Sequence, residues 1–103
     1  MPGFTYRGIG CCANSEGKYY GYVSVNGGST VDDCAQACQS GYSSDPSFVG
    51  INFHPDFYGS TNCNCMLDTD GNGAITDTDP VRCPQELCYS YDEVRHLICF
   101  DCP

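Results

Sequence analysis

The chain has 103 residues, among them 10 cysteines, 8 tyrosines and no tryptophan. That length allows one domain, and the core of so small a domain needs covalent reinforcement. Thirteen acidic residues against four basic ones give a net charge of −9, which disfavours nucleic acid and anionic lipid surfaces as partners. No apolar run approaches the roughly 18 residues of a membrane-spanning helix, so membrane insertion is not expected either.

The cysteines are even in number and make up nearly a tenth of the chain. This usage is typical of a disulfide framework formed in an oxidising compartment, and it predicts a secreted or cell-surface protein. A structural zinc site is the competing interpretation, but only Cys99 and Cys102 have the Cys-x-x-Cys spacing that such sites favour. No repeat or linker divides the chain, so we expect an N-terminal arm, residues 1–10, followed by one disulfide-stapled module, residues 11–103.

The first predicted elements are a strand over residues 19–25 and a helix over residues 31–40. The strand segment is rich in tyrosine and valine and runs into an Asn-Gly-Gly turn. Ser29 or Thr30 can cap the helix, with an acidic residue three positions later, and Gly41 stands where a left-handed residue would end it.

Three further strands are predicted after the helix, over residues 48–53, 62–67 and 94–100. In the second of them, the two-residue strand period places Cys63 and Cys65 on one face, turned inward, and the intervening asparagines on the other. One short helix packed on a small antiparallel sheet gives an α+β fold.

The cysteine spacing predicts a double clamp between helix and strand. Cys34 and Cys38 lie one helical turn apart, and Cys63 and Cys65 lie two strand residues apart, so both pairs advance by about 5 to 7 Å and two parallel disulfides can join them. The expected pairs are Cys34 with Cys65, Cys38 with Cys63 and Cys83 with Cys88, while Cys11 and Cys12 take Cys99 and Cys102 in either order.

Three segments together resemble the PAN/apple superfamily and its near relative, the WSC domain: residues 30–38, residues 48–53 and Cys63-Asn64-Cys65. The resemblance implies a helix disulfide-linked to the central strand. It also implies a non-catalytic module that binds glycans or proteins. Residues 66–82 form an acidic insertion that neither family requires.

This insertion resembles the calcium loop of EF-hand and dockerin proteins. Oxygen-bearing side chains occupy loop positions 1, 3, 5 and 12, glycine occupies position 6, and isoleucine occupies position 8. A hard cation favours six or more oxygen ligands, and the glycine permits the turn that gathers them. The predicted ligands are Asp68, Asp70, Asn72, the carbonyl of Ala74, and Asp79. The competing interpretation is a solvated acidic hairpin turn.

The tyrosines suggest a binding surface, because their rigid amphipathic rings stack on sugars and anchor protein partners. The candidates are Tyr19, Tyr20, Tyr22 and Tyr58. The predicted function is therefore a non-enzymatic extracellular module, stabilised by calcium, that binds carbohydrate or protein. Two alternatives stay open: a self-associating structural subunit of a matrix, appendage or filament, and a small calcium-dependent hydrolase. The hydrolase is disfavoured because no His-Asp pair follows Cys11-Cys12.

Overall fold

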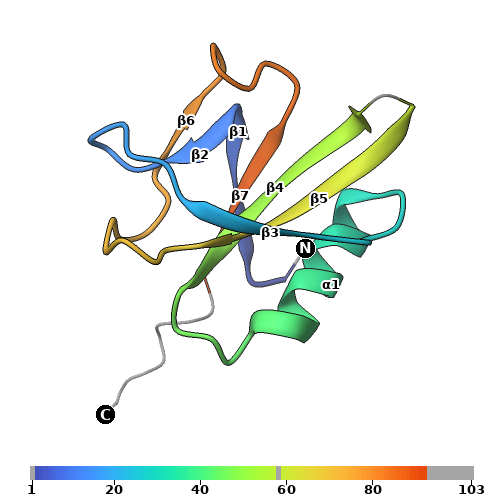
Figure 1. The fold of residues 1–103 in the computed structure, drawn as a ribbon, viewed down its shortest axis with the longest axis horizontal. Coiled ribbons are helices and arrows are strands. Elements are labelled where there is room, and N and C mark those ends of the chain that lie inside the picture. The colour runs from blue at the N-terminus through green and yellow to red at the C-terminus, as the bar shows by residue number, and fades with distance from the viewer. Residues whose placement is uncertain (1, 58, 93–103) are drawn as a thin grey trace.

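The computed structural model describes residues 2–57 and 59–92. Within them the chain forms one helix and seven strands (Figure 1), which confirms the predicted α+β class. In chain order these are β1 (Phe4–Ile9), β2 (Cys11–Ala13), β3 (Gly21–Val25), α1 (Val31–Tyr42), β4 (Phe48–Phe57), β5 (Ser60–Leu67), β6 (Asp77–Asp79) and β7 (Leu87–Tyr91).

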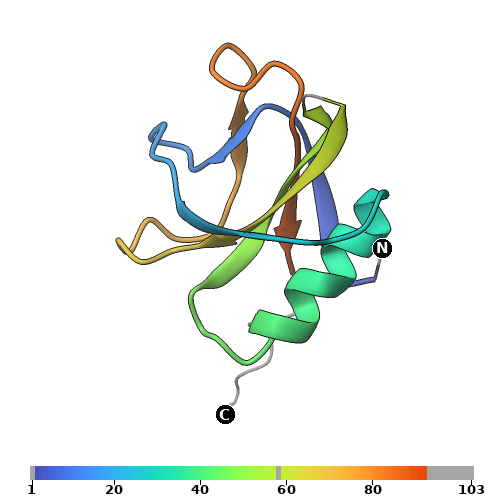
Figure 2. The ribbon, with the colours of Figure 1, turned by 45° about the vertical axis from the view of Figure 1, so that its right-hand side comes forward.

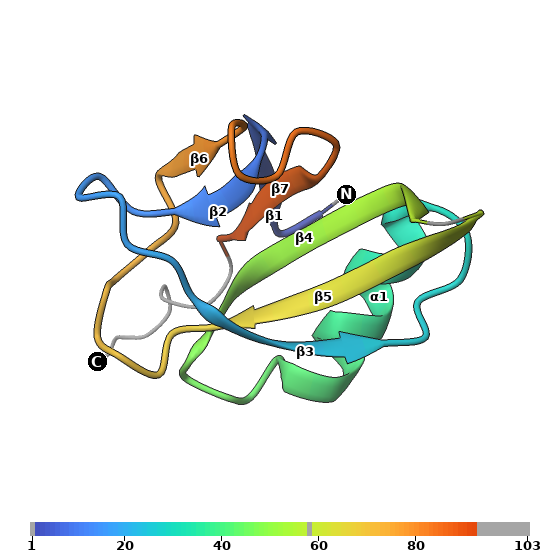
Figure 3. The ribbon, with the colours of Figure 1, turned by 45° about the horizontal axis from the view of Figure 1, so that its top comes forward.

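The main sheet is antiparallel, with five strands in the order β1-β7-β4-β5-β3. α1 covers one face of this sheet, and the two-stranded β2–β6 ribbon lies on the other side of it (Figures 1 and 2). Turned to bring its top forward, the molecule shows α1 behind β5 and β3 (Figure 3). In the part of the chain that the structure describes, no helix is long and apolar enough to cross a membrane.

The segment expected to be an N-terminal arm is an edge strand instead. β1 pairs with β7, with Phe4 opposite Tyr91 and their rings 5.1 Å apart. β7 was not expected, although its sequence, Leu-Cys-Tyr-Ser-Tyr, contains two of the aromatic residues that strands favour. The strand predicted over residues 94–100 lies outside the described residues.

The helix begins as predicted and ends later than predicted. Thr30 is the N-cap, and its Oγ1 accepts a hydrogen bond from the Asp33 backbone N–H at 3.1 Å. Gly41 does not end the helix in a left-handed conformation, because α1 continues to Tyr42 and is capped by Ser43 in the right-handed region. The Tyr42 ring lies 6.3 Å from that of Phe48, a contact that the extra residues bring into place.

Two apolar clusters lie on opposite faces of the sheet. The cluster under α1 contains Phe48, Ile51 and Phe53 of β4, together with the cysteines that join α1 to β5. The cluster on the far face joins the sheet to the segments that cover it, and its members are Cys12, Tyr20, Val49, Met66, Ile75 and Cys88. Ile75, at position 8 of the acidic loop, is fully buried there, as a loop anchor should be.

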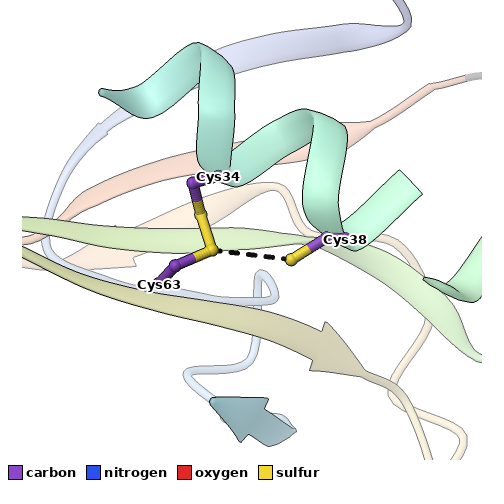
Figure 4. A group of neighbouring side chains, drawn as sticks. All are labelled: Cys34, Cys38 and Cys63. Carbon is purple, nitrogen blue, oxygen red and sulfur yellow. Dashed lines mark hydrogen bonds between the residues drawn. A yellow bond between two sulfur atoms is a disulfide. The ribbon is translucent and has the colours of Figure 1, made fainter. Parts of the chain in front are cut away.

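The double clamp is present, but its partners are exchanged relative to the prediction. Cys34 bonds Cys63 and Cys38 bonds Cys65, with Cα–Cα distances of 5.5 and 5.4 Å. α1 therefore runs in the same direction as β5 rather than against it. Figure 4 shows the cause of the ambiguity: Cys38 Sγ lies only 3.7 Å from Cys63 Sγ, so cysteine spacing fits either pairing.

The remaining predicted pairs are also wrong. Cys11 bonds Cys83, and Cys12 bonds Cys88. Consecutive strand residues point to opposite faces, so within β2 Cys12 turns into the core, where it is fully buried, and Cys11 turns outward. β2 pairs with β6, which brings Cys11 close to the turn that carries Cys83. Cys99 and Cys102 lie outside the described residues.

Candidate functional site

A cavity of about 280 Å³ opens on the sheet face that α1 does not cover. We call it the tyrosine–asparagine groove. β5 supplies its floor with alternate residues that point away from the clamp, and the β6–β7 turn supplies one wall. Its lining residues are Cys11, Cys12, Tyr19, Tyr20, Tyr22, Asn52, Asn62, Asn64, Met66, Arg82, Cys83 and Glu86.

The two central asparagines of the floor differ in what they bind. The Asn52 Oδ1 accepts from the Cys12 backbone N–H at 2.9 Å, and its Nδ2 donates to the Gly10 carbonyl at 3.0 Å. Asn52 thus joins β4 to β2 and is a structural residue. The Oδ1 of Asn64 accepts a hydrogen bond from the Ser24 hydroxyl at 2.7 Å.

Three of the four predicted ligand tyrosines line the groove, and each has a different environment. Tyr22 is 60% exposed, whereas Tyr20 is 7% exposed. Burial, with smaller contributions from Asp68 and Asp77, raises the pKa of Tyr20 to about 12. The Tyr19 ring carries the Arg82 guanidinium, whose Cζ lies 4.3 Å from the ring centroid. Tyr22 is therefore the ring with the largest surface open to a ligand.

The wall formed by the β6–β7 turn is held by hydrogen bonds to Asp79. The Asp79 Oδ1 accepts from the backbone N–H groups of Val81 and Arg82, both at 3.1 Å, and the carboxylate also accepts from the Tyr19 hydroxyl. These bonds, the one from Tyr19 first, hold the pKa of Asp79 below its usual value. The Cys11–Cys83 disulfide fixes the same turn to β2.

Glu86 is the carboxylate of this wall. It is half-buried, and burial raises its pKa, an effect that the neighbouring charge of His54 partly offsets. A carboxyl group with a raised pKa accepts hydrogen bonds when ionised and also donates one when protonated.

The acidic loop folds around the carboxylate of Asp68. Its Oδ1 accepts from the Asn72 backbone N–H and its Oδ2 from the Gly73 backbone N–H, both at 2.8 Å. The Ala74 carbonyl, a predicted calcium ligand, accepts a hydrogen bond from Tyr20. A second hydrogen bond joins the loop to the groove, because Asn72 Nδ2 donates to the Tyr19 carbonyl at 2.9 Å.

Among the described residues, the carboxylates of Asp68, Asp70 and Asp79 do not form a group with their oxygens within 4.8 Å of one another. Asp79 belongs to β6 and binds the following turn and Tyr19, not the loop that begins at Asp68. Asp70 is exposed. Among residues 2–57 and 59–92, Cys34, Cys38 and Cys63 form the only group of three acidic, histidine or cysteine side chains with potential ligand atoms within 4.8 Å. Their sulfurs are in disulfides, so they do not form a metal site, and calcium binding by the loop stays a prediction.

The sequence identified part of the groove and missed the rest. Tyr19, Tyr20 and Tyr22 lie there as candidates, and Tyr58 lies outside the described residues. Asn62, Asn64, Arg82 and Glu86 were not expected. The position of the two asparagines could have been predicted, because the two-residue period of β5 places their side chains on the face opposite Cys63 and Cys65. No local sequence pattern predicts that Arg82 and Glu86 lie in the groove, because their position depends on the Cys11–Cys83 disulfide.

Comparisons with protein-family models, with curated proteins and with solved structures gave no match to this chain.

Proposed function

We propose that the protein is a non-catalytic extracellular recognition module that binds carbohydrate in the tyrosine–asparagine groove. The observation that carries the proposal is the exposed Tyr22 ring beside the amides of Asn62 and Asn64 in one cavity. Sugars present an apolar ring face and a rim of hydroxyls, so an aromatic ring next to side-chain amides matches both parts. The resemblance to PAN/apple and WSC domains supports the same function.

The chemistry of the groove favours binding over catalysis. Glycoside hydrolysis commonly requires two carboxyl groups on either side of the scissile bond. Glu86 is the one carboxylate among the described residues that line the groove. Asp79 is turned into the wall by its bonds to Tyr19 and the turn.

Four disulfides among the described residues are consistent with an oxidising compartment. Six of their eight cysteines are buried, which makes those bridges part of the core. An extracellular location completes the proposal, because ligands of this class are displayed there.

A glycan array probed with the folded, oxidised protein tests the proposal. We expect selective binding to a subset of glycans, and we expect Tyr22→Ala to abolish it. Tyr6→Ala is the matched control, since Tyr6 is also exposed, at 52%, but belongs to edge strand β1. Absence of binding, or equal loss in the two variants, would contradict a saccharide site in the groove.

Self-association is the second candidate function, and one observation favours it. β1 is an edge strand that exposes Tyr6 and Ile9, the latter at 48%. Such an edge is a template for pairing with another strand. Sedimentation across a hundredfold range of concentration distinguishes the candidates: a constant monomer mass supports the recognition module, and growing assemblies that Ile9→Lys prevents support the structural subunit.

A further inference from the structure

The floor of the groove holds a buried hydrogen-bond donor that lacks an acceptor. Asn64 is 7% exposed and lines the cavity. Its Oδ1 is bonded to Ser24, whereas its Nδ2 has no acceptor among the described residues. An unpaired buried amide costs about 1–3 kcal/mol, and native structures seldom keep one without a reason. A ligand atom that accepts from this Nδ2 would remove that cost.

The surroundings of Asn64 specify what kind of acceptor fits. Met66 is the next residue on the same strand face, and Tyr22 is its register partner on β3. Both line the groove and form the apolar side of the space beside the donor, whereas Asn52, the register partner of Asn64 on β4, and Asn62 form its polar side. A sugar hydroxyl that accepted a hydrogen bond from Asn64 Nδ2 would also need an acceptor for its own hydrogen. A carbonyl oxygen only accepts, and a methyl group attached to that carbonyl would bury itself against Met66 and Tyr22.

We infer that the groove recognises an acetamido sugar, with the acetamido carbonyl accepting from Asn64 Nδ2 and the acetyl methyl packed against Met66 and Tyr22. This inference rests on the proposed function and makes Asn64 the specificity-determining residue. The charges around the groove disfavour an anionic sugar. The chain carries −9 and Glu86 lines the groove, while Arg82, the cation there, is already placed over Tyr19.

NMR titration with four methyl glycosides tests the inference: those of N-acetylglucosamine and N-acetylgalactosamine, each beside its parent glucose or galactose glycoside. One gained hydrogen bond and one buried methyl predict at least a tenfold tighter affinity for an acetylated sugar over its parent. We also expect an intermolecular NOE between the acetyl methyl and the Met66 methyl.

Asn64→Asp is the decisive variant, because it keeps the acceptor for Ser24 and replaces the donor. It should remove the preference for the acetylated sugar. Asn62→Asp is the matched control, since it adds the same charge to the same groove and should keep that preference. If Asn64→Asp does not fold, the test is the NOE between the acetyl methyl and the Met66 methyl in the wild-type protein. Its presence supports the inference, and its absence overturns it.

The outcomes separate the two levels of the proposal. Equal binding of acetylated and parent sugars, both lost in Tyr22→Ala, overturns the acetamido inference and leaves carbohydrate recognition standing. Binding of none of the four sugars, with no glycan bound on the array, overturns both.

Discussion

The hydroxyl of Tyr20 lies 3.0 Å from the carbonyl oxygen of Ala74 and donates a hydrogen bond to it, which ties the acidic loop to the residue that precedes β3. The single hydrogen of this hydroxyl is shared with the preceding carbonyl, that of Gly73, at 2.9 Å. Tyr20→Phe should therefore lower the free energy of unfolding by about 1 kcal/mol. Urea denaturation measures this change.

Tyr22→Phe is the control for that experiment. Its ring is exposed, and its hydroxyl has no hydrogen bond to a described residue, so the free energy of unfolding should stay within about 0.5 kcal/mol of wild type. Equal losses in the two variants would show that the Tyr20 hydroxyl does not hold the loop.

Glu86 gives the protein a pH dependence of predictable sign. Burial raises its folded-state pKa, so the folded state binds the proton more tightly than the unfolded state does. The contribution of Glu86 to stability is therefore greatest below its unfolded pKa, 4.5, and is lost as pH rises through the folded pKa. Glu86→Gln should raise the melting temperature at pH 7 and leave it almost unchanged at pH 3.5, by differential scanning calorimetry. A stabilisation that is larger at pH 3.5 would contradict burial as the cause.

Substitution of alanine for two glycines, Gly50 and Gly41, should change the stability of the protein in opposite directions. A Cβ on Gly50 would lie 2.3 Å from the Tyr89 carbonyl oxygen and 2.6 Å from Ile75 Cδ1, so Gly50→Ala should cost about 2 kcal/mol or more. A Cβ on Gly41 meets nothing within 4 Å, and the residue is helical. Gly41→Ala should stabilise the protein by about 0.5–1 kcal/mol. If Gly41 were a left-handed cap, that substitution would destabilise the protein instead. Thermal melts of the two variants measure both changes.

The Cys11–Cys83 bridge should be the first of the four described disulfides to open. Both of its cysteines are partly exposed, whereas the other six are buried, and thiol exchange requires access to sulfur. Limited reduction followed by alkylation and mass spectrometry should label Cys11 and Cys83 first. Early labelling of Cys34 or Cys38 would contradict this order.

Removal of the Cys11–Cys83 disulfide should lower saccharide affinity more than it lowers the stability of the fold. Cys12–Cys88 still joins the same two segments, with a sequence separation of 76 against 72, so Cys11→Ser with Cys83→Ser should cost only about 1 kcal/mol. The turn that carries Arg82 and Glu86 would lose its covalent link to β2 and keep only hydrogen bonds through β6, so saccharide affinity should fall. Unchanged affinity would mean that this wall does not contribute to binding.

Local signals in the sequence were enough to predict the helix, three strands and the inward turn of Cys63 and Cys65. Capping by Thr30, β-branched runs and the strand period are properties of neighbouring residues, and the structure confirms their consequences. The disulfide partners were beyond such signals. Cys34 and Cys38 fit Cys63 and Cys65 equally well in either order, because spacing does not fix the relative direction of α1 and β5.

The site shows the same division between local and distant information. Tyr22 and Asn64 face one groove because β3 and β5 pair, and both strands were predicted from the sequence. Arg82 lies over Tyr19 in a turn that is held by Asp79 and by the Cys11–Cys83 disulfide, which spans 72 residues. The loop signal around Asp68 predicted an ion, and this stays a prediction; the structure adds that the carboxylate accepts from the backbone N–H groups of Asn72 and Gly73.

Chemical-shift mapping on isotope-labelled protein, titrated with the four methyl glycosides, tests the central claim most directly. We expect an acetylated glycoside to shift the side-chain amide signals of Asn62 and Asn64 and the signals of Tyr22, and to leave those of α1 unaffected. Shifts confined to the helix face, or no shifts with any of the four, would contradict a saccharide site in the tyrosine–asparagine groove.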